Sequence, residues 1–246
     1  MNSKPLASLD GLTSQQLVEN ASQIADSIKS WNSGGIFKYS VPQSKEKIKV
    51  DVRTKAHLND DFWVARLNTF DELSPDVRKK LWDQLFKYSI GSTTDLHDSH
   101  TVHEKHYIEE LYDFNITPHS LGDPPCGYES FSYLVETFYK LQWPLKRRRF
   151  SNLVHILKST DQSVAYVISI AIDPAVVPNS SQDPRIIDAQ YTSVERLEYD
   201  GTNLTWLMTT CSDAKGNVPQ WLARASINSV VAKDVPHFLN WVGRKM

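Results

Sequence analysis

The sequence predicts an α+β fold, in which helices pack on one side of a single antiparallel sheet. Three observations lead to this prediction. Runs in which apolar and polar residues alternate fill two long stretches of the chain, as expected for strands with one buried face. Apolar residues at helical spacing mark its beginning, middle and end. The 246 residues are enough for one large core, and they show neither an internal repeat nor an obvious linker.

The first helix is predicted just after a loose N-terminal tail. Thr13 and Gln16 are spaced as in a capping box, in which each side chain binds the other's backbone N–H. Apolar residues follow at helical spacing over residues 17–31. The two glycines at 34–35 are expected to end this helix.

The strands are predicted in two groups. They comprise residues 36–41, 48–52 and 62–67 in the first group, and residues 130–141, 150–158, 163–172, 185–199 and 203–212 in the second. Asp200 and Gly201, between the last two strands, are a strong hairpin signal. Short alternating runs that are separated by polar turns indicate an antiparallel meander.

Three further helices are predicted. Ser74 and Pro75 open the first of them, because serine can cap a helix and proline suits its first turn. The second is expected over residues 101–114, with a loop over residues 117–127. A long apolar stripe near the end of the chain predicts one helix over residues 218–243, kinked where a proline interrupts it.

Composition excludes several classes of protein. The formal net charge is −2 and the pI about 6.4, unlike the basic footprint of a nucleic-acid-binding protein. We find no signal peptide and no apolar run long enough to span a membrane, so we expect a cytoplasmic protein. Cys126 and Cys211 lack the spacing of metal ligands and are expected to be free thiols.

Three segments resemble START domains, which have the helix-grip fold. Residues 213–222 and 232–241 resemble the C-terminal helix of these domains, which follows a proline and ends in a turn that contains Phe-Leu. Residues 141–150 resemble the proline turn that leads into their Arg-rich strand. Phe150 here replaces the acid that commonly follows Arg149, so no role is assigned to that pair.

The strongest resemblance is to a fungal START-like branch that is described as a domain of unknown function. Its pattern includes Trp63 with Arg66, Glu104 with Tyr107, and the run Tyr-Thr-Ser-Val-Glu at 191–195. The resemblance covers about residues 45–243. It implies a curved antiparallel sheet around the long C-terminal helix, with a tunnel between them for a lipid or sterol-like ligand, and it implies no cofactor.

The domain organisation and the ligand site follow from this resemblance. Residues 1–35 are expected to form a tail and a helix that packs on the body, and residues 36–246 the START-like domain. The candidate ligand-binding residues are Arg66, Ile168, Tyr191, Glu195, Trp206 and Met208 on the strands, and Trp221, Val231, Val235 and Phe238 on the last helix. Arg66 and Glu195 lie on apolar strand faces, where a charge is costly unless it is paired. Either they form a structural ion pair, or they orient the polar head of a ligand.

Two further motifs carry charged or titratable groups. The basic run consists of Lys146, Arg147, Arg148 and Arg149 and is either a solvated turn or a transient contact with anionic membrane headgroups. Four histidines recur at every third position, namely His97, His100, His103 and His106. On a helix the first and last of them would lie on opposite faces, so we expect a solvated or locally hydrogen-bonded cluster and no metal site.

Three functions stay open at this point. The sequence lacks a Gly-x-Ser-x-Gly elbow, a phosphate loop and a dinucleotide fingerprint, so no catalytic residue is assigned. The leading function is intracellular binding, and transfer, of a lipid or another hydrophobic small molecule. The alternatives are a ligand-free adaptor on the same fold and a cyclase- or hydrolase-like enzyme. Large side chains that fill the tunnel would favour the adaptor, and polar side chains that converge on it would favour the enzyme.

Overall fold

The computed structural model describes residues 1–56, 61–140, 147–178, 180, 183–213, 215 and 220–245, the side chains of residues 220–226 excepted. Nine strands form one sheet in the order β1-β2-β3-β9-β8-β7-β6-β5-β4. The strands are β1 Asn32–Tyr39, β2 Ile48–Ala56, β3 Phe62–Asn68, β4 Leu111–His119, β5 Tyr128–Tyr139, β6 Arg148–Ser159, β7 Val164–Ala171, β8 Ile187–Tyr199 and β9 Leu204–Asp213. The α-helices are α1 Ser14–Ser27, α2 Pro75–Gln84, α3 His100–Glu104 and α4 Gln220–Gly243.

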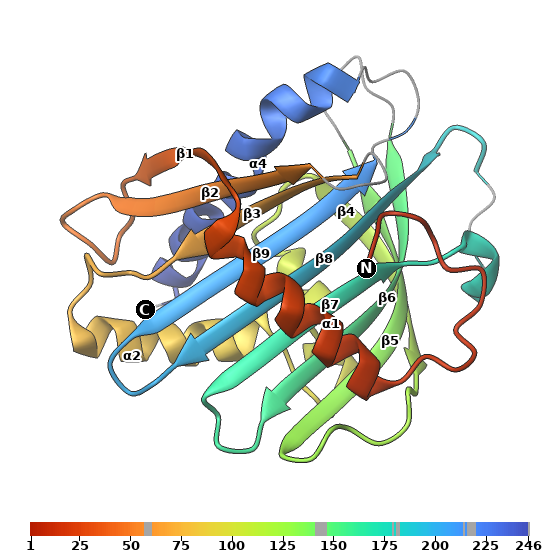
Figure 1. The fold of residues 1–246 in the computed structure, drawn as a ribbon, viewed down its shortest axis with the longest axis horizontal. Helices are drawn as coiled ribbons and strands as arrows, with labels where there is room; N and C mark the ends of the chain where they lie inside the picture. The colour runs from red at the N-terminus through yellow and green to blue at the C-terminus, as the bar shows by residue number, and fades with distance from the viewer. Residues whose placement is uncertain are drawn as a thin grey trace.

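The sheet lies between α1 on one face and the other helices on the opposite face (Figure 1). Neighbouring strands are antiparallel, and β6 makes an additional short parallel pairing with β8. The sheet curves around α4, which contacts β1, β2 and β3. The predicted α+β helix-grip architecture is therefore confirmed. The prediction that all helices share one side is wrong, because α1 covers the convex face against β7, β8 and β9.

The start of α1 has the predicted capping box. The Thr13 hydroxyl accepts a hydrogen bond from the Gln16 backbone N–H at 3.2 Å, and the Gln16 side chain accepts one from the Thr13 N–H at 3.1 Å. The predicted end of the helix is wrong. After α1, one short 3₁₀ turn over Ile28–Ser30 leads directly into β1, which contains both glycines. Gly35 has a φ of +114° next to a register shift, so it serves a bulge instead of a helix end.

The helix predicted over residues 101–114 is also wrong. It is replaced by the short α3 and by β4, which forms one edge of the sheet. Phe114, Ile116 and Pro118 alternate with polar residues, which is the pattern of a half-buried strand, and an edge strand tolerates proline. The extra strand also takes up the first residues of the predicted loop.

The two helices on the concave face begin close to where the sequence predicts. Pro75 occupies the first turn of α2, which continues as a single π-helical segment, η2, over Leu85–Ser89. In α4, Pro236 lies inside the helix, and Val231, Val235 and Phe238 are buried against the sheet. None of the described helices combines the length and apolar composition of a membrane span. Both cysteines are free thiols, as predicted.

Candidate functional site

A cavity of about 540 Å³ lies between the concave face of the sheet and α4. Pockets of this size hold drug-sized ligands. The lining residues come from the sheet, from α3 and the segment after it, and from α4. They are Arg66, His100, Glu104, Tyr107, Ile108, Glu110, Tyr139, Phe150, Ser169, Tyr191, Ser193, Glu195, Trp206, Met208, Thr210, Ser212, Ile227, Val230, Val231, Lys233, Asp234 and His237.

One row of side chains crosses three neighbouring strands and faces this cavity. Arg66 on β3 is directly opposite Met208 on β9, which is directly opposite Glu195 on β8. Residues that oppose each other in antiparallel strands point to the same side of the sheet. Trp206, two residues before Met208, shares that side because of the two-residue period of a strand. Strand register alone therefore brings these four side chains together.

Arg66 is a buried cation with few hydrogen bonds. Its side chain is 2% exposed, and its nitrogens lie 3.9 Å from carboxylate oxygens of Glu195 and of Asp234. Its Cζ lies 4.0 Å from the centre of the Trp206 ring. Neither Nε nor Nη1 has a hydrogen-bond partner among the described residues. These two N–H groups are therefore available to an acceptor that enters the cavity.

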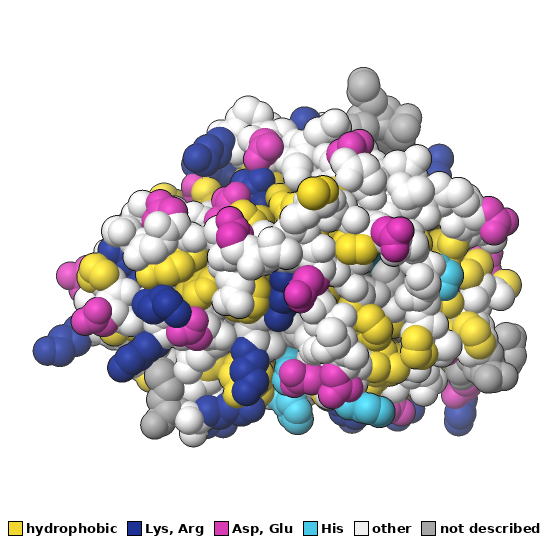
Figure 2. Space-filling model, turned by 90° about the horizontal axis from the view of Figure 1, so that it is seen from below, with side chains coloured by type: hydrophobic (Ala, Val, Ile, Leu, Met, Phe, Trp, Pro, Cys, Tyr) yellow, Lys and Arg dark blue, Asp and Glu magenta, His cyan; other side chains and the backbone are white. Residues whose placement is uncertain are grey.

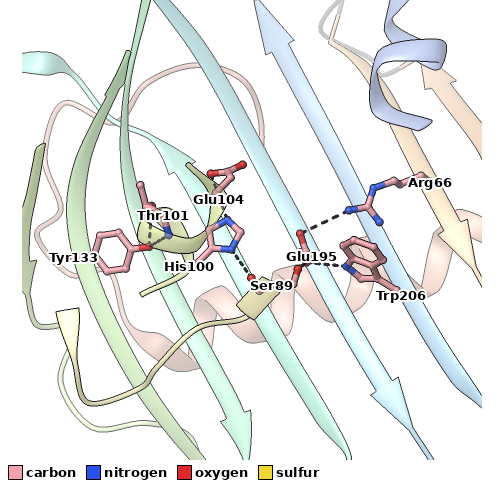
Figure 3. Close-up of polar contacts among 8 residues, drawn as sticks. All are labelled: Arg66, Ser89, His100, Thr101, Glu104, Tyr133, Glu195 and Trp206. Carbon is pink, nitrogen blue, oxygen red and sulfur yellow. Dashed lines mark hydrogen bonds and ion pairs between the residues drawn. The ribbon is translucent and has the colours of Figure 1, made fainter. Parts of the chain in front are cut away.

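Glu195 is held by neutral donors. Its Oε1 accepts hydrogen bonds from the indole N–H of Trp206, at 2.7 Å, and from the Ser89 hydroxyl (Figure 3). Its contact with Arg66 is longer than a hydrogen bond. The two residues thus form a loose ion pair, and whether they also orient a ligand stays a prediction.

The segment from η2 to α3 forms the polar wall opposite Arg66. The π-helical turn places the Ser89 hydroxyl on Glu195 and its carbonyl on Nδ1 of His100, which donates to it. Nε2 of His100 lies 3.7 Å from Glu104 (Figure 3). Tyr133 of β5 anchors this wall by a hydrogen bond with the Thr101 hydroxyl at 3.0 Å. Single π-helical turns often occur at functional sites.

Two carboxylates face the cavity without a hydrogen bond to any described residue. The pKa of Asp234 is raised to about 7, mainly by burial; Arg66 acts to lower it, and the negative charges of Glu104 and Glu195 act to raise it. Burial likewise raises the pKa of Glu104, although His100 lowers it. Both groups therefore hold protons more tightly than ordinary carboxylates.

Aromatic rings form the wall beside Glu104. Phe150 contacts Tyr139 and Tyr191 edge to face, with ring centres 5.4 and 5.3 Å apart. Burial raises the pKa values of Tyr139 and Tyr191, and the charge of Glu104 raises them further.

The structure brings together most of the predicted ligand-binding residues. Those that line the cavity are Arg66, Tyr191, Glu195, Trp206, Met208 and Val231. Val235 and Phe238 are completely buried next to the cavity, where Phe238 packs edge to face on Trp206. The side chain of Trp221 lies outside the described residues.

Ile168 does not line the cavity, so its prediction is wrong. It packs in the core cluster under α1, with Leu17 and Val194, on the opposite face of the sheet. The alternation of β7 separates the two faces, but it does not say which one looks inward. The position of α4 decides which face of the sheet lines the cavity.

Sequence reasoning identified Glu195 but missed Glu104 and Asp234, two other acidic groups of the cavity. Glu104 and Tyr107 belonged to the family resemblance but were not assigned to the site. Asp234 follows Val231 by three residues, so helical spacing places both on one face of α4. That spacing could have identified Asp234 as a lining residue. The approach of His100 to the cavity has no comparable signal, because it depends on the non-helical path after η2.

Two arginines of the basic run, Arg148 and Arg149, point into the protein. Arg148 is 2% exposed and donates to the Lys215 carbonyl. Arg149 is buried and paired with Glu136 at 3.2 Å and with Asp188 at 2.7 Å. The predicted headgroup contact is therefore wrong for these two arginines, because β6 turns them into the protein. Arg147 is exposed, and Lys146 lies outside the described residues.

The four histidines lie in different environments. His97 and His106 are exposed, whereas His100 and His103 are buried and have local polar partners, in agreement with the prediction of a solvated or locally hydrogen-bonded cluster. Nε2 of His103 lies 2.8 Å from Asp98. Figure 2 shows histidines next to acidic side chains at the lower edge of the face seen from below. No three potential metal ligands lie together anywhere in the described part of the chain.

A curved antiparallel sheet that encloses a cavity against a long C-terminal helix defines a START-like, helix-grip protein. Solved structures share this fold at low sequence identity. Human STARD10 is 13% identical with a TM-score of 0.59, over 92% of this chain and 78% of that one. Human StAR-related lipid transfer protein 5 is 10% identical with a TM-score of 0.58, over 92% and 98%. The lipid transfer and protein localization domain of human StarD13 gives 12% and 0.53, over 92% and 95%.

The chain belongs to the family of proteins of unknown function named DUF3074, whose model matches residues 63–242. This confirms the resemblance on which the sequence prediction rested. No curated protein matches the sequence. The likeness to the human domains shows the fold, whereas function depends on the residues that line the cavity.

Proposed function

We propose that this protein binds a lipid or a similar hydrophobic small molecule in the cavity under α4, and transfers it between membranes. The observation that carries the proposal is the cavity itself, about 540 Å³ between a sheet and a helix that would otherwise pack together. Protein interiors are normally close-packed, so an unfilled volume of this size indicates a ligand-binding site. The names of the similar human domains, which refer to lipid transfer, support the same function.

The lining suits an amphipathic ligand. Met208, Ile227, Val230 and Val231 provide apolar surface, and the row from Arg66 to Glu195 provides polar groups. Burial of an apolar chain stabilises a complex by about 25 cal/mol per Å² of apolar area, less the cost of association. The apolar part of the ligand would supply affinity, and the polar groups would fix its orientation.

The experiment is native mass spectrometry of the purified protein, followed by extraction and identification of what it carries. Met208→Trp places a large side chain in the middle of the cavity. We expect this variant to remain folded and to lose the bound molecule. Ile36→Trp is the matched control, because Ile36 is 63% exposed and lies outside the cavity lining. If Met208→Trp retains the ligand, or the wild-type protein carries none from cell membranes or liposomes, the proposal fails and the adaptor takes its place.

One observation favours the enzyme as a second candidate. Polar side chains converge on the cavity, and Asp234, with a pKa of about 7, has the proton affinity that general acid–base catalysis requires. An enzyme would change the mass of the ligand that it binds. Incubation of the extracted ligand with fresh protein, analysed for new products against Asp234→Asn, decides between a carrier and an enzyme.

A further inference from the structure

The polar end of the cavity contains more acidic than basic groups. Glu104, Glu195 and Asp234 face it, and Arg66 is the buried cation among the described lining residues. Lys233 lies at the exposed rim. One guanidinium cannot neutralise three carboxylates. Burial raises the pKa values of Asp234 and Glu104, and the neighbouring carboxylates also act to raise them.

Glu104 and Asp234 are the carboxylates that still lack donors. Glu195 is already bound by Trp206 and Ser89. The side chains of Glu104 and Asp234 are 22% and 29% exposed, and both line the cavity. They come from α3 and α4, two elements that are far apart in the sequence. A carboxylate in such a position is stabilised by a donor that carries positive charge.

The surroundings of Glu104 suit an organic cation in particular. Tyr139, Phe150 and Tyr191 line the same cavity, and Phe150 contacts both tyrosine rings. Aromatic faces attract ammonium groups, and the attraction grows when water is excluded. Carboxylate and aromatic rings together therefore favour ammonium over an equally sized neutral group.

Arg66 adds a second requirement. Its side chain is almost completely buried, and neither Nε nor Nη1 has a hydrogen-bond partner among the described residues. They need an oxygen acceptor. A head with only a positive charge would leave them unsatisfied and would be repelled by the guanidinium if it came too close.

We propose that the cavity selects a single-chain amphiphile whose head carries an organic ammonium, bound by Glu104 and Asp234, and a nearby oxygen acceptor, bound by Arg66. This deepens the proposed function and rests on it. The cavity volume matches one drug-sized molecule, so one chain or a sterol-sized body fits it. Long-chain amino alcohols and single-chain phospholipids with an amine share this chemistry.

The ammonium should bind more tightly as pH rises. Deprotonation of Asp234, whose pKa is about 7, creates the negative charge that the ligand needs. The charged and titratable groups that face Asp234 from the packed elements are Arg66, Glu195, His100, Glu104, Tyr107, Glu110, Lys233 and His237. Since the wild-type pKa reflects all of them, the pH dependence has to be read as a difference from Asp234→Asn.

The test measures dissociation constants of four probes with one matched chain, below their micelle concentrations: dodecylamine, dodecanol, dodecanoate and dodecylphosphocholine. We expect dodecylamine to bind more tightly than dodecanol at pH 8, by about tenfold to a hundredfold, the range of one charge-assisted hydrogen bond. Dodecylphosphocholine adds an oxygen acceptor for Arg66, but its quaternary ammonium has no N–H to donate, so it should bind more tightly than dodecanol by charge attraction alone. The preference for dodecylamine should shrink at pH 6, and dodecanoate should bind more weakly than dodecanol.

Isosteric variants locate the effect. Glu104→Gln and Asp234→Asn should each reduce the preference for dodecylamine and leave dodecanol binding unchanged. Glu109→Gln is the control, since Glu109 is exposed in the same segment and does not line the cavity. If dodecanoate or dodecanol binds as tightly as dodecylamine, or the variants keep the preference, the head-group inference is wrong while lipid binding stands. If no probe binds and native mass spectrometry finds no ligand, the proposed function itself fails.

Discussion

The guanidinium of Arg66 stacks on the indole of Trp206, with Cζ 4.0 Å from the ring centre, and the N–H of the same indole donates to Glu195 at 2.7 Å. One aromatic side chain thus positions both members of the ion pair. The ring is completely buried against Phe70 and Phe238. The polar end of the cavity is therefore fixed by the apolar core behind it.

Arg66→Met should destabilise the protein in a pH-dependent way. The variant keeps an apolar chain of similar length but leaves Glu195 and Asp234 without their cation. We expect a loss of about 2 kcal/mol at pH 8, below the full cost of breaking a buried ion pair because the contacts are 3.9 Å long. Protonation of Asp234, whose pKa is raised to about 7, should reduce the loss at pH 5.5. Urea unfolding at both pH values measures it, with the exposed Arg185→Met as control. An equal loss at both pH values would contradict the ion pair.

Trp206→Phe tests the hydrogen bond to Glu195. The smaller ring retains apolar packing but removes a donor to a carboxylate, which costs about 1–3 kcal/mol. Trp82→Phe is a suitable comparison, since Trp82 is equally buried and stacks on Tyr199. Denaturation should show the larger loss for Trp206. Equal losses would mean that only ring size matters.

Asp234→Asn should stabilise the protein at neutral and alkaline pH. A carboxyl whose pKa is raised to about 7 in the folded state makes the wild-type protein lose stability as pH rises from about 4 to 7, and asparagine does not ionise. The gain should grow over that range and stay constant above it, at about 2–4 kcal/mol. Thermal and urea unfolding between pH 4 and pH 8 test this, with the exposed Asp83→Asn as control. A gain that does not depend on pH would disprove the raised pKa.

His155→Gln tests the contact between α1 and the convex face. His155 is completely buried and hydrogen-bonds Ser14 of α1 and Ser132 of β5, each at 2.7 Å. Burial lowers its pKa to about 4, so stability that is present above the unfolded pKa of about 6.5 should be lost as pH falls towards 4, by up to about 3 kcal/mol. The glutamine variant should lack this part of the acid sensitivity. Unfolding curves for wild type, His155→Gln and the exposed His97→Gln provide the comparison, and parallel pH profiles would refute it.

Some elements could be predicted from the sequence because their signals are local. The capping box of Thr13 and Gln16, Pro75 in the first turn of α2 and the Asp200-Gly201 turn depend on neighbouring residues only, and all are present. Strand β4 was not predicted, because Leu111 and Tyr112 also fit the helical spacing of the residues before them. An element at a sheet edge is defined by the strand beside it, which a local pattern does not contain.

By itself, the sequence determined the alternation of most strands, the stripe of α4 and therefore the α+β class, and the resemblance to START domains added the helix-grip arrangement. It also determined that Arg66, Met208 and Glu195 lie on apolar strand faces. Tertiary structure decided the rest. The strand register placed those three side chains in one row. Because α4 lies on their side of the sheet, that face lines the cavity, whereas Ile168 lies on the opposite face. The path after η2 brought Glu104 to the cavity that Asp234 also lines. The physical reason is that periodicity within one segment fixes which residues share a face. Contacts between distant segments decide which faces pack together and which charged groups remain unpaired between them.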